Sequence, residues 1–372
     1  MVTDLEKGRI TNRQLLFAVV CFLSGSTMIS YFAIGITKQD TWFVCITGFA
    51  LGLLIAIMIV QLSKKFPDQT LVDINTSVFG KTGGKIITSL YVFHWLNFVT
   101  LEVRDVGSFI HGLILPETPV EVIYILFIMA CSYAVLKGIT AIGRISFIIA
   151  VIIIVTFSFN GILLTGYMDF KNFYPMLSLP LNNYIYATFL LAIIHFGGSY
   201  TFLMVFPFVN DRKNMAKYFY TGGFIGFLIF IYIIARDWAV GGPLTAILTV
   251  PSFQILRIID IGGILTRLEV LFLIVFLVAN FYKTTIEYYA LILATAQLTG
   301  LKSYKNLVYV IAPIIICYSV LIFTSNMENS YFGINVSPYY GAIFGTLLPG
   351  ITLIIAKIKE IKKNKSLKRG IV

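Results

Sequence analysis

The chain is poor in charged residues. Only 12% of its 372 residues are Asp, Glu, Lys or Arg, whereas 58% are hydrophobic. A typical soluble domain carries about 25% charged residues, because its surface faces water. The shortage excludes an ordinary soluble protein. The composition instead predicts an all-α polytopic membrane protein.

Residues that bind metals or form disulfides are also scarce. The three histidines are spread too widely along the chain for a metal cluster. No phosphate-binding or dinucleotide-binding loop follows a strand-like segment. The four cysteines lie in apolar runs and indicate small buried side chains rather than disulfides: Cys21, Cys45, Cys131 and Cys317. The sequence therefore predicts no metal, no cofactor and no enzymatic activity.

What the chain does contain is a series of long apolar segments. A membrane-spanning helix needs about 20 mostly apolar residues, and ten segments approach or exceed that length. They cover residues 14–34, 41–62, 86–110, 120–137, 145–166, 185–208, 219–238, 268–296, 306–324 and 338–357. The first is too long for the apolar core of a cleaved signal peptide, so it is predicted to remain as a span.

Lysine and arginine predict how these spans are oriented. Most of them fall between spans on one side of the predicted membrane, together with residues 1–13 and the basic tail 358–372. Basic residues accumulate on the cytoplasmic side, so both termini are predicted to be cytoplasmic. The net charge of +11 then faces the lipid bilayer surface rather than a nucleic acid. We expect one membrane domain made of two five-helix repeats, 14–166 and 185–357.

Two spans are interrupted near their middle by small residues. The first contains Ser24-Gly25-Ser26-Thr27, and the sixth contains His195-Phe196-Gly197-Gly198-Ser199-Tyr200. Breaks at corresponding positions of two halves indicate an inverted repeat with a ligand site at the bilayer midplane. Small residues also let helices pack closely, and this second interpretation stays open for each break alone. Free helix ends could hold the carboxylate and ammonium groups of an amino acid, with Phe98 lining the pocket.

Polar and ionisable residues inside the spans are further candidates, because such groups are costly in a bilayer. Glu102 and Arg104 lie in the third span, and Arg267 and Glu269 open the eighth. We expect cross-helix ion pairs between these two sets, which act either as a clamp or as a gate. Asn280 and Thr284 could bind an ion or join helices. Lys283 and Glu287, four residues apart, could pair on one helix face, either as a local pair near the cytoplasmic interface or as part of an ion relay.

Several short patterns in this order resemble the endospore germination permeases. They are Leu101-Glu102-Val103-Arg104, Leu115-Pro116-Glu117-Thr118-Pro119, residues 170–177 with Asn172 and Pro175, Pro207 followed by Asp211-Arg212-Lys213, and Arg267-Leu268-Glu269. This family comprises the B-subunits of nutrient germinant receptors and belongs to the amino acid–polyamine–organocation (APC) superfamily. The resemblance covers nearly the whole chain.

The resemblance implies a LeuT-like fold of ten transmembrane helices, with a 5+5 inverted repeat and broken helices 1 and 6. It implies a spore receptor that binds a small nutrient, an amino acid, and partner A- and C-subunits in the spore inner membrane. Thr27 and Phe32 stand where the family often has glycine and proline, and Tyr200 replaces a common acidic residue. Two alternatives share this fold. One is a secondary amino acid transporter coupled to Na⁺ or H⁺, and the other is a ligand-gated path for water or ions.

Overall fold

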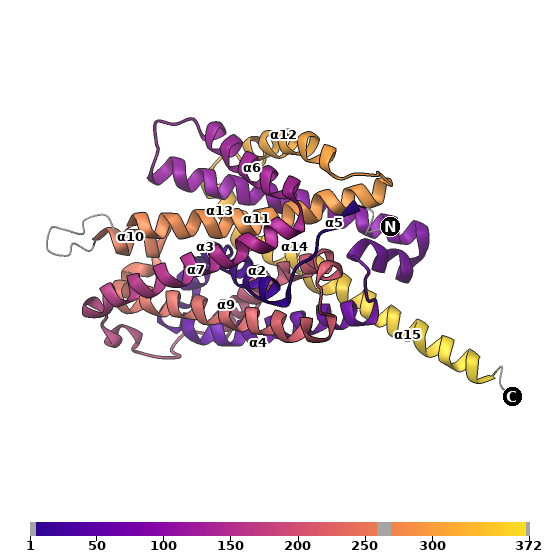
Figure 1. Ribbon diagram of the computed structural model, residues 1–372. Coiled ribbons are helices and arrows are strands. Elements are labelled where there is room, and N and C mark those ends of the chain that lie inside the picture. The colour runs from indigo at the N-terminus through magenta and orange to yellow at the C-terminus, as the bar shows by residue number, and fades with distance from the viewer. Residues whose placement is uncertain (1–4, 259–268, 370–372) are drawn as a thin grey trace.

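The structure is a computed structural model that describes residues 5–258 and 269–369 (Figure 1). These residues form helices joined by short connections, and the described part of the chain contains no β-sheet. Its one isolated β-bridge joins Ile10 to Val209 in parallel. The described chain begins and ends at the same end of the helix bundle, which we call the terminal end. The short helix α10 (Pro251–Ile258) lies at the opposite end, which we call the α10 end.

The predicted fold class is confirmed, and the helices follow the ten apolar segments. Span 1 is α2 (Asn12–Ser24) with α3 (Thr27–Thr37), and span 6 is α8 (Leu181–Leu191) with η4 (Ala192–Phe196), η5 (Gly197–Met204) and η6 (Phe206–Phe208). Span 10 is α14 (Ser337–Ala342), η8 (Ile343–Leu347) and α15 (Leu348–Arg369). The remaining spans are α4 (Thr41–Lys65), α5 (Leu71–Leu113), α6 (Val120–Lys137), α7 (Ile139–Leu164), α9 (Arg212–Gly241), α11 (Glu269–Thr299) and α12 (Lys305–Leu321).

Length and apolar character alone identify fewer separate spans. Within the described residues, eight helical stretches could cross a membrane by this test, and a ninth if α12 is counted together with α13 (Asn326–Asn335). The difference from ten has a simple cause. The stretch Tyr31–Lys65 combines α3 and α4, although the chain turns between them at Lys38, where φ is 47°. Helix α2 is too short to pass by itself, because span 1 is broken.

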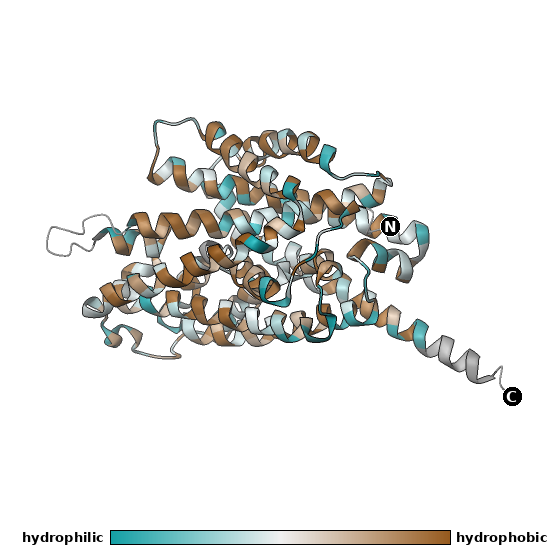
Figure 2. Cartoon of the chain, viewed as in Figure 1, coloured by the Kyte–Doolittle hydropathy of each residue, from teal (hydrophilic) through white to brown (hydrophobic). Residues whose placement is uncertain are grey.

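Apolar side chains cover the outside of the bundle (Figure 2). On α7, Val155 and Ile162 are 59% and 70% exposed, and on α6 Leu126 is 63% exposed. A soluble protein rarely exposes such continuous apolar surface, whereas lipid tails solvate it at no cost. The described chain is therefore a multi-pass membrane protein.

Helices α2 and α11 form the centre of the bundle. Helix α2 packs against α7, α9 and α11, and α11 packs against α2, α5, α6 and α7. Every residue of α11 from Tyr282 to Ala294 is buried. A helix that is buried on all sides contacts other helices instead of lipid. Polar groups on α11 therefore face protein or an internal cavity.

Span 1 begins with a well-formed cap and breaks where it meets α11. The Thr11 hydroxyl accepts a hydrogen bond from the Gln14 amide, and the Gln14 side chain accepts one from the Thr11 amide, which is a capping box. At the break, a Cβ on Gly25 would lie 2.7 Å from Lys283 Cβ and 2.9 Å from the Ala279 carbonyl oxygen. Only glycine permits this close approach of span 1 to α11.

Span 6 changes its helical geometry rather than unwinding. It is α-helical to Leu191, π-helical over Ala192–Phe196 and 3₁₀-helical from Gly197 to Met204. Such a long 3₁₀ segment is uncommon, and π segments often occur at functional sites. Span 10 contains a π-helical segment as well, at Ile343–Leu347. The two irregular regions contact each other, because a Cβ on Gly345 would lie 2.5 Å from the Gly197 carbonyl oxygen.

A buried charged cluster holds α10 against the bundle. Arg236 and Asp237, at the end of α9, are 2% and 0% exposed and form an ion pair of 2.6 Å. Ser252 of α10 accepts a 2.8 Å hydrogen bond from Arg236 and donates one to Asp237. Tyr31 of α3 donates a 2.7 Å hydrogen bond to the same Ser252 hydroxyl. The cluster thus ties α10 to the half of span 1 beyond the break.

The terminal end is closed by the segment that precedes α2. Arg9 donates a 2.9 Å hydrogen bond to the Pro207 carbonyl at the end of span 6, and Arg212 donates a 2.8 Å bond to the same carbonyl. Asp211 caps α9 by accepting from the Lys213 and Asn214 amides. The hydrogen bond from the Asn214 side chain lowers the pKa of Asp211, because it stabilises the charged carboxylate. These contacts fix both ends of the connection between spans 6 and 7.

Candidate functional site

A small cavity lies where the interrupted spans 1 and 6 meet α5, α11 and span 10. Its volume is about 30 Å³. That space is enough for one or two water molecules, but it is too small for an amino acid, so the cavity is nearly closed in this conformation. The cavity is lined by Phe22, Ser26, His94, Phe98, Ile193, Ile194, Gly197, Gly198, Tyr200, Lys283, Glu287, Ser337 and Gly341. We call it the central cavity.

An ion pair crosses from α11 to α5 beside the central cavity. The Lys283 ammonium contacts the Glu102 carboxylate, and the two residues are 3% and 4% exposed. The Thr284 hydroxyl donates a further 3.4 Å hydrogen bond to Glu102. The Lys283 ammonium also lies 6.0 Å from the centre of the Phe22 ring, on the α2 side of the break. Lys283 therefore connects the break of span 1 to α5.

Glu287 lies one helical turn beyond Lys283 and lines the same cavity. It is 2% exposed. Its Oε1 atom is 3.7 Å from the position that a Cβ on Gly198 would take, so its carboxylate lies against the irregular part of span 6. Its Oε2 atom is buried and has no hydrogen-bond partner among the described residues. The central cavity therefore has an ammonium at one point of its wall and a carboxylate at another.

Aromatic side chains gather around the cavity where α5 meets spans 6 and 10. His94 stacks on Phe344 of span 10, with ring centres 3.9 Å apart, and lies 5.7 Å from Tyr200 of span 6. Tyr91 donates a 3.1 Å hydrogen bond to the Phe344 carbonyl, inside the π-helical segment of span 10. Trp95 donates a 3.0 Å bond to the Thr201 hydroxyl. The side chains of α5 thus support the irregular parts of both spans 6 and 10.

A larger cavity of about 280 Å³ lies on the α10 side of the central cavity. We call it the vestibule. Phe98 and Ser337 line both cavities, Glu102 lines the vestibule and Lys283 lines the central cavity. The ion pair therefore lies at the boundary between the two. Asp105 also lines the vestibule and accepts a 2.6 Å hydrogen bond from Asn329 of α13.

The structure gathers some of the predicted ligand residues and separates others. Ser26, Phe98, Gly197, Gly198 and Tyr200 line the central cavity, and Gly25 contacts α11 directly beside it. The Ser24 hydroxyl donates instead to the Val20 carbonyl of its own helix, at 2.9 Å. Thr27 begins α3, but its side chain lies outside the described part of the structure.

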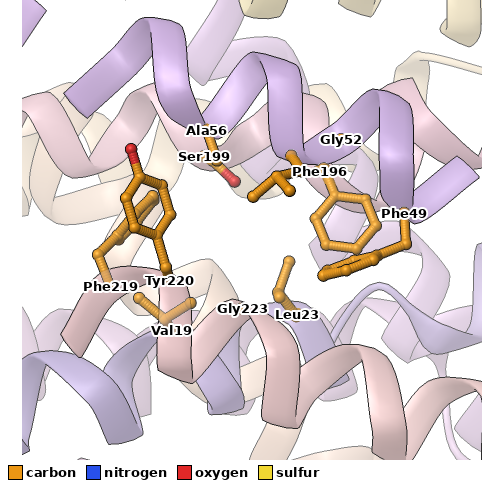
Figure 3. Close-up of a pocket in the computed structure, with 11 residues that line it drawn as sticks. Val19, Leu23, Phe49, Gly52, Ala56, Phe196, Ser199, Phe219, Tyr220 and Gly223 are labelled. Atoms are coloured by element: carbon orange, nitrogen blue, oxygen red, sulfur yellow. The ribbon is translucent and has the colours of Figure 1, made fainter. Parts of the chain in front are cut away.

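The other predicted residues of span 6 face away from the central cavity. His195 stacks on Phe230 of α9, with ring centres 4.4 Å apart. Phe196 and Ser199 line a separate, mostly apolar cavity of about 20 Å³ between α2, α4, span 6 and α9 (Figure 3). Successive residues of a helix point in different directions, so one stretch of sequence cannot turn all its side chains toward one site. Of this stretch, Gly197, Gly198 and Tyr200 line the central cavity, whereas His195, Phe196 and Ser199 do not.

Two of the residues predicted to form ion pairs, Glu102 and Arg104, contact other residues than expected. Glu102 pairs with Lys283, and Arg104 donates a 2.9 Å hydrogen bond to the Ser319 carbonyl of α12. The expected local pair of Lys283 with Glu287 is wrong, because the ammonium goes to Glu102. Glu102 and Lys283 can meet because they lie at similar depths along neighbouring helices. At about 1.5 Å per residue, Glu102 lies about 17 Å from the Leu113 end of α5 and Lys283 about 21 Å from the Glu269 end of α11.

The remaining polar candidates occupy less central positions. Glu269 is 8% exposed at the first turn of α11, and Arg267 lies outside the described residues. The Asn280 side chain donates to the Phe276 carbonyl of its own helix, at 2.8 Å. The contribution of span 10, Ser337 and Gly341, was not predicted. One sequence feature could have indicated that span 10 contributes to the cavity. Its apolar segment contains residues that disturb a helix, Ser337-Pro338 and Gly341.

Comparisons with known proteins give a family and a fold. The family model described as "Spore germination protein" matches residues 9–328. Among curated proteins of Bacillus subtilis (strain 168), "Spore germination protein KB" is 26% identical over 97% of this chain and 98% of its own length. "Spore germination protein YndE" is 24% identical over 87% of this chain and 88% of its own length.

Two solved transporters have the same fold. One is Mhp1, a nucleobase-cation-symport-1 family transporter in a closed conformation with bromovinylhydantoin bound. It aligns with a TM-score of 0.68 over 94% of this chain and 79% of its own, at 14% identity. The other is a substrate-bound, outward-open Na⁺-coupled sialic acid symporter, with a TM-score of 0.68 over 95% and 90% of the two chains, at 10% identity.

Proposed function

The chain belongs to the spore germination protein family, and from this premise we propose that it is the B-subunit of a spore germinant receptor. It binds a small nutrient, an amino acid, in the central cavity and passes the signal to partner A- and C-subunits. It resides in the spore inner membrane with both termini in the cytoplasm, so the terminal end faces inward and the vestibule opens outward. Its two five-helix repeats act as one membrane domain.

The observation that carries this proposal is the meeting of spans 1 and 6 around a cavity deep inside the bundle that two buried charged residues line. Irregular backbone is tolerated at membrane depth only where protein buries it or a cavity adjoins it. Here the break of span 1 and the 3₁₀ segment of span 6 adjoin the central cavity, together with Lys283 and Glu287. Ionisable residues inside a membrane mark functional paths. The combination favours a binding site over a purely structural break.

The size of the two cavities supports a signalling role. An amino acid fits the vestibule of about 280 Å³ but not the central cavity of about 30 Å³. Binding in the central cavity therefore requires movement of spans 1, 6 or 10 and of the boundary at Glu102 and Lys283. A ligand that binds one conformation better than another shifts the protein toward that conformation. Partner subunits that contact the moving spans would detect the shift.

The alternative is a secondary amino acid transporter driven by Na⁺ or H⁺. The shared fold with two transporters, one of them Na⁺-coupled, favours this second function. Fold alone does not decide between the two, because one fold hosts several functions. In the transporter, the same movement would open the central cavity toward the terminal end instead of signalling to a partner.

The test is binding and uptake by the purified full-length protein in liposomes. Labelled amino acids are supplied with and without Na⁺ and pH gradients. Binding without accumulation supports the receptor, whereas accumulation that requires a gradient supports the transporter. The variant Gly198→Leu places a side chain 3.2 Å or less from Phe22, inside the cavity, and should abolish binding. Gly166→Leu is the matched control, since nothing lies within 4 Å of a Cβ there. Normal binding by Gly198→Leu contradicts the site.

A further inference from the structure

The charges around the central cavity are uneven. Lys283 supplies one ammonium, and Glu102 and Glu287 supply two carboxylates, all of them at most 4% exposed. The Lys283 ammonium is bound by Glu102. Glu287 is left with a buried oxygen that has no hydrogen-bond partner in the described structure, on the wall of the cavity. A buried carboxylate is costly unless it is paired, so this position favours a positively charged guest.

The surroundings of Glu287 suit an organic ammonium better than a metal ion. Phe22 and Tyr200 line the cavity with it, and aromatic faces attract organic cations. Hard cations such as Ca²⁺ require six or more oxygen ligands. Apart from Glu287, the side chains of the cavity supply only the hydroxyl oxygens of Ser26, Tyr200 and Ser337. The missing side chain at Gly198 leaves room for a small group directly beside the Glu287 carboxylate.

Lys283 adds a second requirement. It is four residues before Glu287 on α11, so the two side chains lie on one helix face, one turn apart. A ligand with only an ammonium group would be held close to a second ammonium, which is unfavourable. A ligand with both an ammonium and a carboxylate places opposite charge at each position. Its carboxylate would share Lys283 with Glu102, at the boundary to the vestibule.

We propose that Glu287 binds the ammonium group of a zwitterionic ligand whose carboxylate faces Lys283, so that one turn of α11 selects α-amino acids. The inference rests on the proposed function and names the two side chains that would hold the charged groups of the ligand in the same cavity. Sugars lack both charges, simple amines lack the carboxylate, and simple carboxylates lack the ammonium. The orientation also places the ligand between span 6 and the break of span 1, so the ligand contacts both.

The experiment measures ligand-dependent thermal stability and binding constants of the purified full-length protein. Each standard L-amino acid is screened, with D-glucose as an uncharged nutrient. The amino acid that stabilises the protein is then compared with its N-acetyl derivative, which lacks the ammonium, and with its methyl ester, which lacks the carboxylate. A hydrogen bond to a charged group contributes substantially to the binding free energy, so loss of the ammonium should weaken binding about 10- to 100-fold. Glu287→Gln should weaken binding of the parent amino acid by the same factor.

The decisive comparison combines the two changes. If the ammonium contacts Glu287, N-acetylation should cost much less in Glu287→Gln than in the unmodified protein, because the contact is already lost. Glu287→Asp, which keeps the charge, should retain the preference for the free ammonium. Glu121→Gln is the matched control, because Glu121 is exposed at the start of α6; it should bind as the unmodified protein does.

Three outcomes overturn the inference. An equal N-acetylation penalty in Glu287→Gln and the unmodified protein places the ammonium elsewhere. A methyl ester that binds as well as the amino acid removes Lys283 from recognition. Stabilisation by D-glucose but by no amino acid overturns the inference and the amino acid as the proposed ligand, and leaves only a nutrient receptor of the same family standing. A protein that binds none of these nutrients contradicts the proposed function itself.

Discussion

The buried ion pair between Glu102 and Lys283 allows a quantitative prediction. Both side chains are at most 5% exposed, and the pair joins α5 to α11 at the boundary between the cavities. Glu102→Gln leaves the Lys283 ammonium buried without its counter-charge. Lys283→Met leaves the Glu102 carboxylate in the same condition. Breaking a buried pair from one side costs about 3–5 kcal/mol, whereas replacing both partners is often nearly neutral.

We therefore expect each single variant to lower the free energy of unfolding by about 3–5 kcal/mol. The double variant Glu102→Gln/Lys283→Met should be destabilised far less than the sum of the two. The measurement is reversible unfolding of the purified protein in mixed detergent micelles, followed by circular dichroism. Glu360→Gln is the control, because its pair with Lys65 lies at the surface, where Glu360 is 61% exposed. This control should show no measurable change.

Two results would refute this reasoning. Additive losses in the double variant would mean that the side chains act independently, as packing groups. Losses below about 1 kcal/mol in both single variants would mean that water solvates the pair through the vestibule, as it does for exposed ion pairs.

Two further predictions follow from the packing around spans 1 and 7. Gly25→Ala places a methyl group 2.7 Å from Lys283 Cβ and 2.9 Å from the Ala279 carbonyl oxygen. Because this contact is too close, we expect the free energy of unfolding to fall by about 1–3 kcal/mol and nutrient binding to weaken. Unchanged values for both would show that span 1 moves freely against α11. Asp237→Asn removes the counter-charge of buried Arg236 and should release α10, which faster hydrogen exchange or proteolysis of residues 251–258 would report. Protection equal to that of the unmodified protein would show that apolar contacts hold α10.

Several features were predictable because they depend on local sequence. The number and place of the spans follow from runs of about 20 apolar residues, which the bilayer thickness requires. The break at Gly25 was visible as small residues inside an apolar run, and so was the irregular segment around Gly198. The sequence did not indicate that span 6 continues as a π and then a 3₁₀ helix. That geometry depends on contacts with α4 and span 10 and on the hydrogen bond from α5 to Thr201.

The sequence by itself determined that this chain is a multi-pass helical membrane protein, that spans 1 and 6 are interrupted and that Glu102 and Arg104 lie inside a span. These properties depend on composition and on position along single helices. Only the tertiary structure decided which of these residues meet. It joined Lys283 to Glu102, turned His195 toward α9 and brought span 10 to the cavity, because side-chain partners depend on the rotation and depth of helices distant in sequence. The charged centre of this protein arises from that packing.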